Sequence, residues 1–160
     1  MKAMSPAVVW SLSMGALCAP VGIGVGLFIG SSATGAGYEN FWLPAGLAAF
    51  VTAAGLWWLI VEWRGRYTAL RGMTAGFLAG ILAHPVCWYF MLVAANVCYW
   101  TTDGCRSSLN EPPMNLAQAV LGAAVLSFWS LLLFGIVTGP GGMIIGGLLG
   151  RERKKSVNSA

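Results

Sequence analysis

The chain has 160 residues, of which 58% are hydrophobic and 9% are charged, and its formal net charge is +4. Soluble globular domains carry roughly 25% charged residues, because charge keeps a folded surface in water. The composition therefore excludes an ordinary soluble domain, and the excess of apolar residues excludes an intrinsically disordered chain. Both exclusions indicate a single integral membrane domain.

Four apolar stretches are long enough to cross a bilayer as helices. A helix rises 1.5 Å per residue, so about 20 apolar residues span a hydrocarbon core of about 30 Å. The stretches cover residues 6–30, 41–61, 72–97 and 116–138, each to within a few positions. They are too long and too continuously apolar for barrel strands, which cross in about 10 alternating residues. We therefore predict an all-α, polytopic integral membrane protein, a bundle of four transmembrane helices.

Two of these helices have recognisable start signals. Ser5 before Pro6 fits an N-cap followed by proline at the first helical position. Asn115, with Gln118 three residues later, fits a capping box. These residues predict that the first and fourth helices begin at positions 6 and 116.

The fourth apolar stretch is interrupted by the sequence Gly139-Pro140-Gly141-Gly142. Proline and glycine both disfavour a helix interior. We therefore expect the helix to end near Thr138, followed by a Gly-rich interfacial segment at residues 139–150 and a basic tail at 151–160. The break lacks the Gly-Lys-Ser/Thr ending of a phosphate loop and a preceding strand, so it does not predict a nucleotide site.

The basic residues predict the orientation of the chain. With four passes, eight of the nine lysines and arginines fall on one side, and Arg106 alone falls on the other. Because cytoplasmic segments are enriched in basic residues, both termini are expected in the cytoplasm. The membrane that the chain crosses is then expected to be the inner cell membrane. The basic residues expected there are Lys2, Arg64, Arg66, Arg71, Arg151, Arg153, Lys154 and Lys155. The net charge thus reflects topology and attraction to lipid headgroups, and direct nucleic-acid binding is not expected.

A cleaved signal peptide is the alternative reading of the first stretch. Its n-region has a single lysine, Lys2, and Pro20 follows the small-residue site at which cleavage would occur. We therefore expect the first stretch to be a retained span.

The four cysteines separate by their predicted depth. Cys18 and Cys87 fall within apolar stretches, where thiols are inert packing groups. Cys98 and Cys105 bracket the start of the predicted outer loop, where an oxidising compartment would allow a disulfide. Two unpaired thiols are the alternative. No second pair of ligands lies nearby for a zinc site.

Small residues recur at every fourth position in three of the predicted helices. Positions four apart lie on one helix face, and such faces let helix backbones approach closely in lipid. They pack either within one bundle or against a neighbouring subunit, and the number of such faces favours a homo-oligomer or a larger membrane complex. The glycines concerned are Gly22, Gly26, Gly30, Gly72, Gly76, Gly80, Gly135 and Gly139.

His84 is the one ionisable residue expected near the bilayer midplane. Such residues are costly in lipid and by default suggest function. Pro85 removes a backbone donor beside it, and Cys87 lies on the same general face, so these three residues form a candidate intramembrane site. The alternative is a neutral imidazole that is hydrogen-bonded to a facing helix, to Thr52, Ser127 or Ser130.

Enzymatic activity is not expected, because no carboxylate lies beside His84 in sequence and no catalytic or metal-binding spacing is recognisable. No cofactor is expected either. Two functions remain. One is a non-catalytic assembly, anchor or sensor subunit, in contact with membrane lipids, that packs through its glycine faces and presents its basic segments to a cytoplasmic protein. The other is an oligomeric channel or small-solute transporter with His84 at its centre.

The predicted topology can be tested with reporter fusions. An alkaline phosphatase domain fused after Ala160 is expected to stay inactive, and one fused within residues 106–109 is expected to be active, because only the latter reaches an oxidising compartment. Activity after Ala160 would overturn the orientation.

Overall fold

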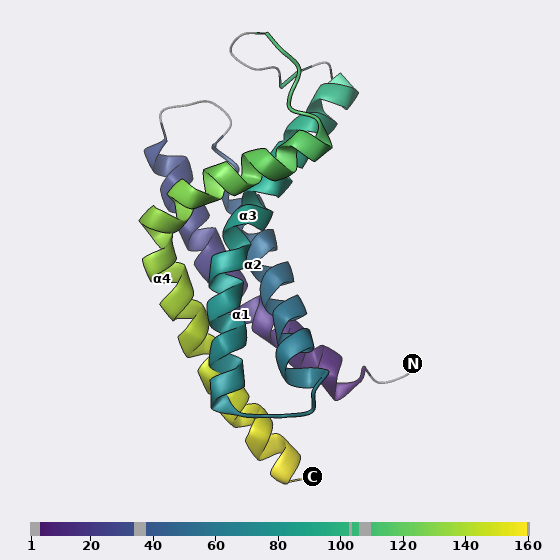
Figure 1. The fold of residues 1–160 in the computed structure, drawn as a ribbon, viewed down its shortest axis with the longest axis vertical. Coiled ribbons are helices and arrows are strands. Elements are labelled where there is room, and N and C mark those ends of the chain that lie inside the picture. The colour runs from purple at the N-terminus through teal and green to yellow at the C-terminus, as the bar shows by residue number, and fades with distance from the viewer. Residues whose placement is uncertain (1–3, 34–37, 103, 106–109, 160) are drawn as a thin grey trace.

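The computed structural model describes residues 4–33, 38–102, 104–105 and 110–159, and this part of the chain is helical without strands. Its elements are α1 (Pro6–Ser32), α2 (Trp42–Trp57), the short π-helix η1 (Trp58–Glu62), α3 (Ala69–Thr102) and α4 (Leu116–Asn158) (Figure 1). η1 continues α2. Four helices, counting α2 and η1 together, are long and apolar enough to cross a membrane. The all-helical prediction is confirmed, and these lengths and compositions indicate a multi-pass membrane protein.

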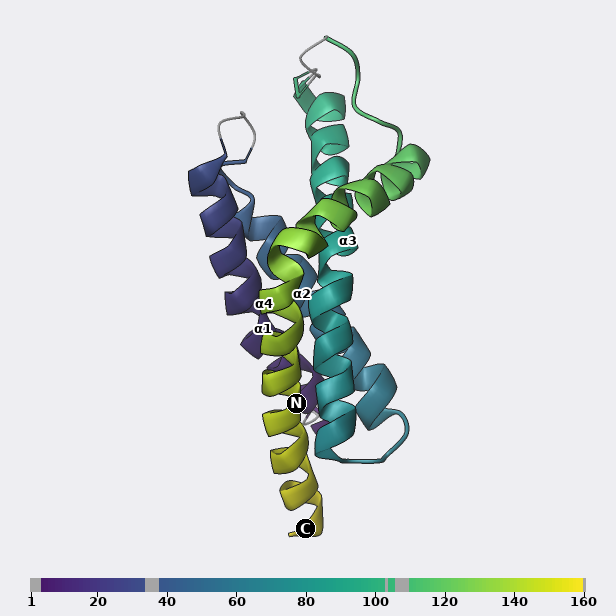
Figure 2. The ribbon, with the colours of Figure 1, turned by 60° about the vertical axis from the view of Figure 1, so that its left-hand side comes forward.

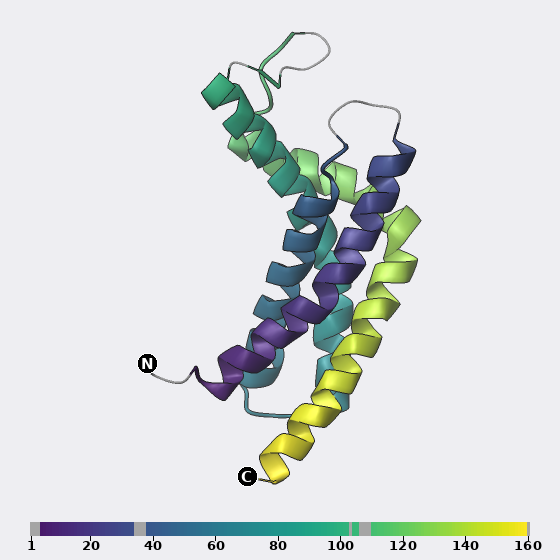
Figure 3. The same ribbon diagram turned by 180° about the vertical axis from the view of Figure 1, so that it is seen from behind.

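The helices form two antiparallel hairpins, α1–α2 and α3–α4. The start of α1, the connection between α2 and α3, and the end of α4 lie at the same end of the bundle (Figures 1 and 3). Contact is extensive within each hairpin and between α2 and α3, but slight between α1 and α4. Of the four boundaries between neighbouring helices, the one between α1 and α4 therefore has the least contact.

The α1–α2 hairpin is packed through glycine. A methyl group at Gly22 would collide with the Ala45 carbonyl and with Ala49, and one at Gly26 would collide with the backbone of Trp42. Gly30 lies against the carbonyl of Tyr38, just before α2. The first small-residue stripe therefore faces the same chain.

The α3–α4 hairpin is packed backbone to backbone. Gly72 faces the carbonyl of Gly146, Gly76 faces that of Gly142, and Gly80 faces that of Thr138. These pairs advance four residues along α3 as they recede four along α4, which is the register of two antiparallel helices. A side chain at any of the three glycines would overlap the opposite main chain.

The prediction that the fourth helix ends near Thr138 is wrong. α4 continues through Pro140 to Asn158, so residues 139–150 belong to the same helix as the fourth apolar stretch. Gly142 and Gly146 stay helical because they are the contact points for α3, and the ring of Pro140 lies on the exposed side. Figure 2 shows that α4 nevertheless bends in its light-green middle, before this packed part begins.

The predicted helix starts are correct. The Asn115 side chain accepts a hydrogen bond from the Gln118 backbone N–H at 2.9 Å, as expected of an N-cap. Pro6 opens α1, although the Ser5 hydroxyl makes no capping bond. α3 is longer at both ends than the predicted 72–97, because Ala69 and Thr102 still belong to it.

The number of glycine stripes in the sequence favours an oligomer, but in the structure these stripes face other parts of the same chain. Seven of the eight predicted packing glycines contact another part of this chain, and Gly139 does so through Phe77 and Ile81. Gly135 is the exception, since a methyl group there would meet only Leu131 of its own helix. The small residues are therefore explained by packing within the chain.

Adding one methyl group at Gly76 is expected to destabilise the bundle, because it would press on the Gly142 carbonyl. We expect Gly76→Ala to lower the unfolding midpoint in detergent. Gly55→Ala is the matched control, since nothing lies within 4 Å of that position and alanine favours a helix over glycine by about 0.5–1 kcal/mol. Equal midpoints for the two variants would contradict the packing described for α3 and α4.

Candidate functional site

His84 is buried between α3 and α4, at the next position of the stripe formed by Gly72, Gly76 and Gly80. Its Nδ1 lies 2.5 Å from the Ser130 hydroxyl and its Nε2 lies 2.9 Å from the Thr138 hydroxyl. Ser130 was one of the three partners considered from the sequence, whereas Thr138 was not. The imidazole lies just beyond the close backbone contact between α3 and α4, and its two hydrogen bonds link α3 to α4 at this point.

Either ring nitrogen of His84 can be the donor, depending on the tautomer, and we assign the protons from the neighbouring hydroxyl groups. The Thr138 hydroxyl donates to the Phe134 carbonyl at 3.2 Å, so its oxygen accepts from His84 Nε2–H. Nδ1 is then an acceptor, and the Ser130 hydroxyl donates to it. In this assignment the imidazole is neutral and both of its nitrogens are hydrogen-bonded.

Pro85 and Cys87 accompany His84 on α3, as predicted. Pro85 lies inside the helix, which continues past it. Cys87 is buried and free, and so is Cys18 of α1. The two thiols line the same cavity as His84.

That cavity lies between the two hairpins and has a volume of about 580 Å³, including the space at its open mouth. Its polar side chains are His84, Ser130 and Thr138, and the rest of the wall is aliphatic, aromatic, thiol or glycine. The other lining residues are Cys18, Val21, Gly22, Val25, Ile29, Phe41, Ala45, Ala49, Ala79, Gly80, Ala83, Cys87 and Gly142. All four helices contribute to the wall.

A second buried polar group lies toward the end of the bundle where α1 begins and α4 ends. Arg153 Nε donates to Glu62 Oε1 and its terminal nitrogen donates to Oε2, both at 3.0 Å. The Trp57 indole donates to Glu62 Oε1 at 3.3 Å. The side chains of Glu62 and Arg153 are 1% and 9% exposed, so water screens the pair little.

Aromatic rings cover the guanidinium of Arg153. Its central carbon lies 4.6 Å from the ring centre of Tyr67 and 5.6 Å from that of Trp10, which are cation–π distances. Trp10 belongs to α1, Glu62 to η1 and Tyr67 to the connection before α3. The ion pair therefore joins the end of α4 to the rest of the bundle.

This group corrects the sequence assignment of Arg153. Arg153 was expected among the accessible basic residues of a tail, but its side chain is buried and paired with Glu62. The expected tail is itself helical as far as Asn158. The sequence did contain a signal: Glu62 is an acidic residue that directly follows an apolar stretch. A carboxylate that is buried at such a position requires a cation nearby.

The other basic residues with described side chains differ from Arg153. Arg71 is half-buried and donates to the Ile60 carbonyl at 3.3 Å, and the exposed ones are Arg64, Arg66, Arg151, Lys154 and Lys155.

The predicted disulfide is present, with Cys98 and Cys105 Sγ atoms 2.10 Å apart. Cys98 lies in the last turns of α3, and Cys105 follows it in the loop. The bond fixes that loop to the helix end. It lies far from His84, at the end of the bundle opposite the ion pair (Figure 1).

Among the described residues, no three His, Cys, Asp or Glu side chains gather in a way that would hold a metal ion. No protein-family model matches this chain, and no curated protein or solved structure is similar enough to match it. The chemistry of the site must therefore be argued from its own residues.

Glu62→Gln is expected to lower the free energy of unfolding by about 3–5 kcal/mol, because it leaves the buried Arg153 without a counter-ion. The matched control is Glu152→Gln, which removes an exposed ion pair with Lys155 and should cost less than about 1 kcal/mol. Denaturant titration in micelles measures both. Equal losses in the two variants would show that the Glu62–Arg153 pair is not a principal tie.

Proposed function

We propose that this chain is a non-catalytic subunit of assembly, anchor or sensor type, embedded in the inner cell membrane with both termini in the cytoplasm. Its cytoplasmic end binds an acidic protein partner. The protein acts as a homo-oligomer or as one member of a larger membrane complex, in contact with lipid along its apolar sides.

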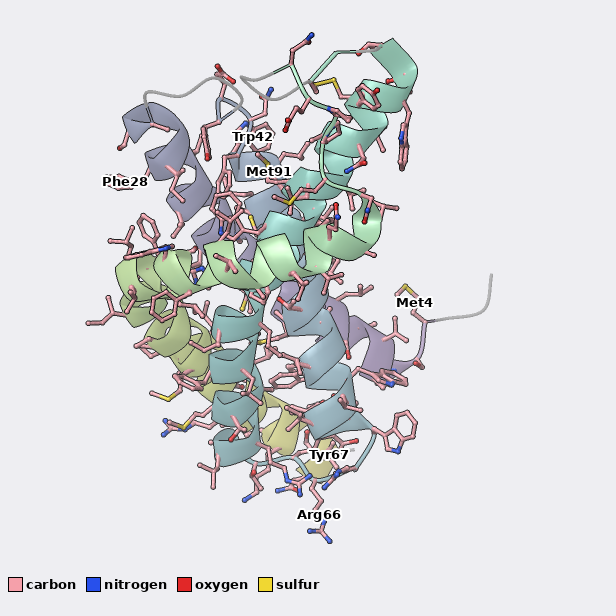
Figure 4. The ribbon with its side chains drawn as sticks, turned by 45° about the horizontal axis from the view of Figure 1, so that its top comes forward. Met4, Phe28, Trp42, Arg66, Tyr67 and Met91 are labelled. Atoms are coloured by element: carbon pink, nitrogen blue, oxygen red, sulfur yellow. A yellow bond between two sulfur atoms is a disulfide. The ribbon has the colours of Figure 1, made fainter. Side chains whose placement is uncertain are left out.

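The observation that carries this proposal is the set of exposed basic side chains at one end of the bundle. Arg64 and Arg66 come from the connection after η1, and Arg151, Lys154 and Lys155 come from the last turns of α4. Figure 4 shows Arg66 and Tyr67 at the end opposite Phe28 and Trp42. Electrostatic attraction of this kind favours an acidic partner or an anionic membrane surface.

The spacing on α4 supports a protein partner. Arg151, Lys154 and Lys155 are three and four residues apart, so they share one helix face, while Arg153 points inward to Glu62. Because the ion pair fixes the rotation of this helix, the three cations are held in a defined arrangement. A preorganised arrangement of this kind binds with a smaller entropic cost than a flexible tail.

The alternative is an oligomeric channel or small-solute transporter centred on His84. A neutral imidazole that uses both nitrogens within one bundle, in a largely apolar cavity, does not favour an aqueous path. A change in ion or solute flux in His84→Ala vesicles, with assembly intact, would favour the channel over the subunit.

Charge reversal at the basic end tests the proposal. Arg151→Glu combined with Lys154→Glu is expected to weaken capture of the cytoplasmic partner roughly tenfold, since each surface charge contributes up to about 1 kcal/mol. Capture is measured by cross-linking in native membranes, followed by mass spectrometry of the linked proteins.

The matched control places acidic charge at the other end of the same helix, as Gln118→Glu. It should leave the linked proteins unchanged. If the double variant retains the same partners at the same yield, the basic end is not the binding surface.

A further inference from the structure

We propose that the cavity between the two hairpins binds a neutral, single-chain lipid that carries a hydroxyl group, with the hydroxyl donating to the Ser130 or the Thr138 oxygen beside His84. This binding site is independent of the cytoplasmic partner proposed above and requires only that the chain is embedded in lipid.

The hydrogen-bond inventory determines the polarity of the ligand. In the tautomer assigned above, the protons of Ser130, Thr138 and His84 Nε2 are directed to His84 Nδ1, the Phe134 carbonyl and Thr138 respectively. The hydroxyl oxygens of Ser130 and Thr138 keep acceptor lone pairs. The wall can therefore accept a hydrogen bond from a ligand, but its side chains offer no spare strong donor. A ligand O–H satisfies this site, whereas an ether or a ketone does not.

The charge of the lining excludes ionic ligands. Among the residues that line the cavity, none is a carboxylate, lysine or arginine. Glu62 and Arg153, the buried charges described above, neutralise each other elsewhere in the bundle. A phosphate, carboxylate or ammonium group in this cavity would lose its hydration without gaining a counter-charge. A single hydroxyl group can enter the cavity, because a hydrogen bond to Ser130 or Thr138 replaces the hydration that it loses.

The apolar lining of the cavity favours a hydrocarbon chain. The cavity is bounded by side chains and glycines of all four helices. Branched and aliphatic side chains of α1, among them Val21, Val25 and Ile29, form one wall. An extended alkyl chain that follows this wall gains dispersion contacts with its branched side chains.

The seam between α1 and α4 supplies the route of entry. These helices meet only slightly, and one of their contacts is an edge-to-face pair of Phe28 and Phe134 rings with centres 6.0 Å apart. Phe28 is mostly exposed and lies at the edge of the bundle (Figure 4). Both rings lie at the boundary with lipid, where small side-chain movements admit a chain without breaking either glycine-packed hairpin.

The test uses the full-length protein in phosphatidylcholine nanodiscs and a long-chain alcohol with a diazirine at its methyl end. On illumination, labelling should map by mass spectrometry to cavity residues of α1 and α3. Unlabelled alcohol should compete, and its methyl ether, which differs by the loss of the donor, should compete roughly three- to tenfold less well. Equal competition by the ether would overturn the assigned polarity.

A cavity-filling variant locates the site. Ala83→Leu should reduce labelling at least tenfold, and the control Ala124→Leu, at an exposed position of α4 outside the cavity, should not. If Ala83→Leu fails to fold, as judged by its elution and helical signal, Val25→Phe fills the space from the opposite wall. Undiminished labelling in a folded cavity-filled variant would refute the site.

Discussion

The contact of the α3 and α4 backbones is the constraint on which the rest of the structure depends. Lipid does not drive apolar helices together, so association depends on dispersion forces that act over very short distances. Glycine at Gly72, Gly76 and Gly80 lets the main chains meet, and this contact keeps α4 helical through Pro140. It also decides where His84 lies, because the next position on the same face must enter the widening space between the helices.

Much of the architecture could be predicted because it follows from local sequence. The number of long apolar helices, the Asn115 cap and the Cys98–Cys105 bond depend on length, capping chemistry and spacing. For His84 the sequence offered Thr52, Ser127 and Ser130 as partners without a choice among them, and the structure shows Ser130 together with Thr138. The course of α4 could not be predicted in this way. Gly139 to Gly142 is a helix-breaking sequence by propensity, yet Gly142 lies in a continuous helix where its backbone packs against Gly76 of α3, which is a tertiary effect.

The Glu62–Arg153 pair was missed for a similar reason. Its residues are separated by 91 positions, and sequence alone gives no register between the end of α4 and η1. Because Arg151 and Lys154 are also basic, the local sequence predicts that Arg153 belongs to a solvated tail. The helix instead turns it inward, toward the carboxylate, an indole donor and two aromatic faces. Charge that looks uniform along the chain is thus divided into one structural residue and several accessible ones.

The long sequence separation of that pair has a consequence for biosynthesis. Ribosomes make Glu62 well before Arg153, so the carboxylate enters the nascent hairpin without its cation. A polypeptide terminated anywhere in between retains an acidic group that the aromatic residues around it cannot neutralise. Completion of the last helical turns of α4 therefore coincides with neutralisation of the buried Glu62 carboxylate.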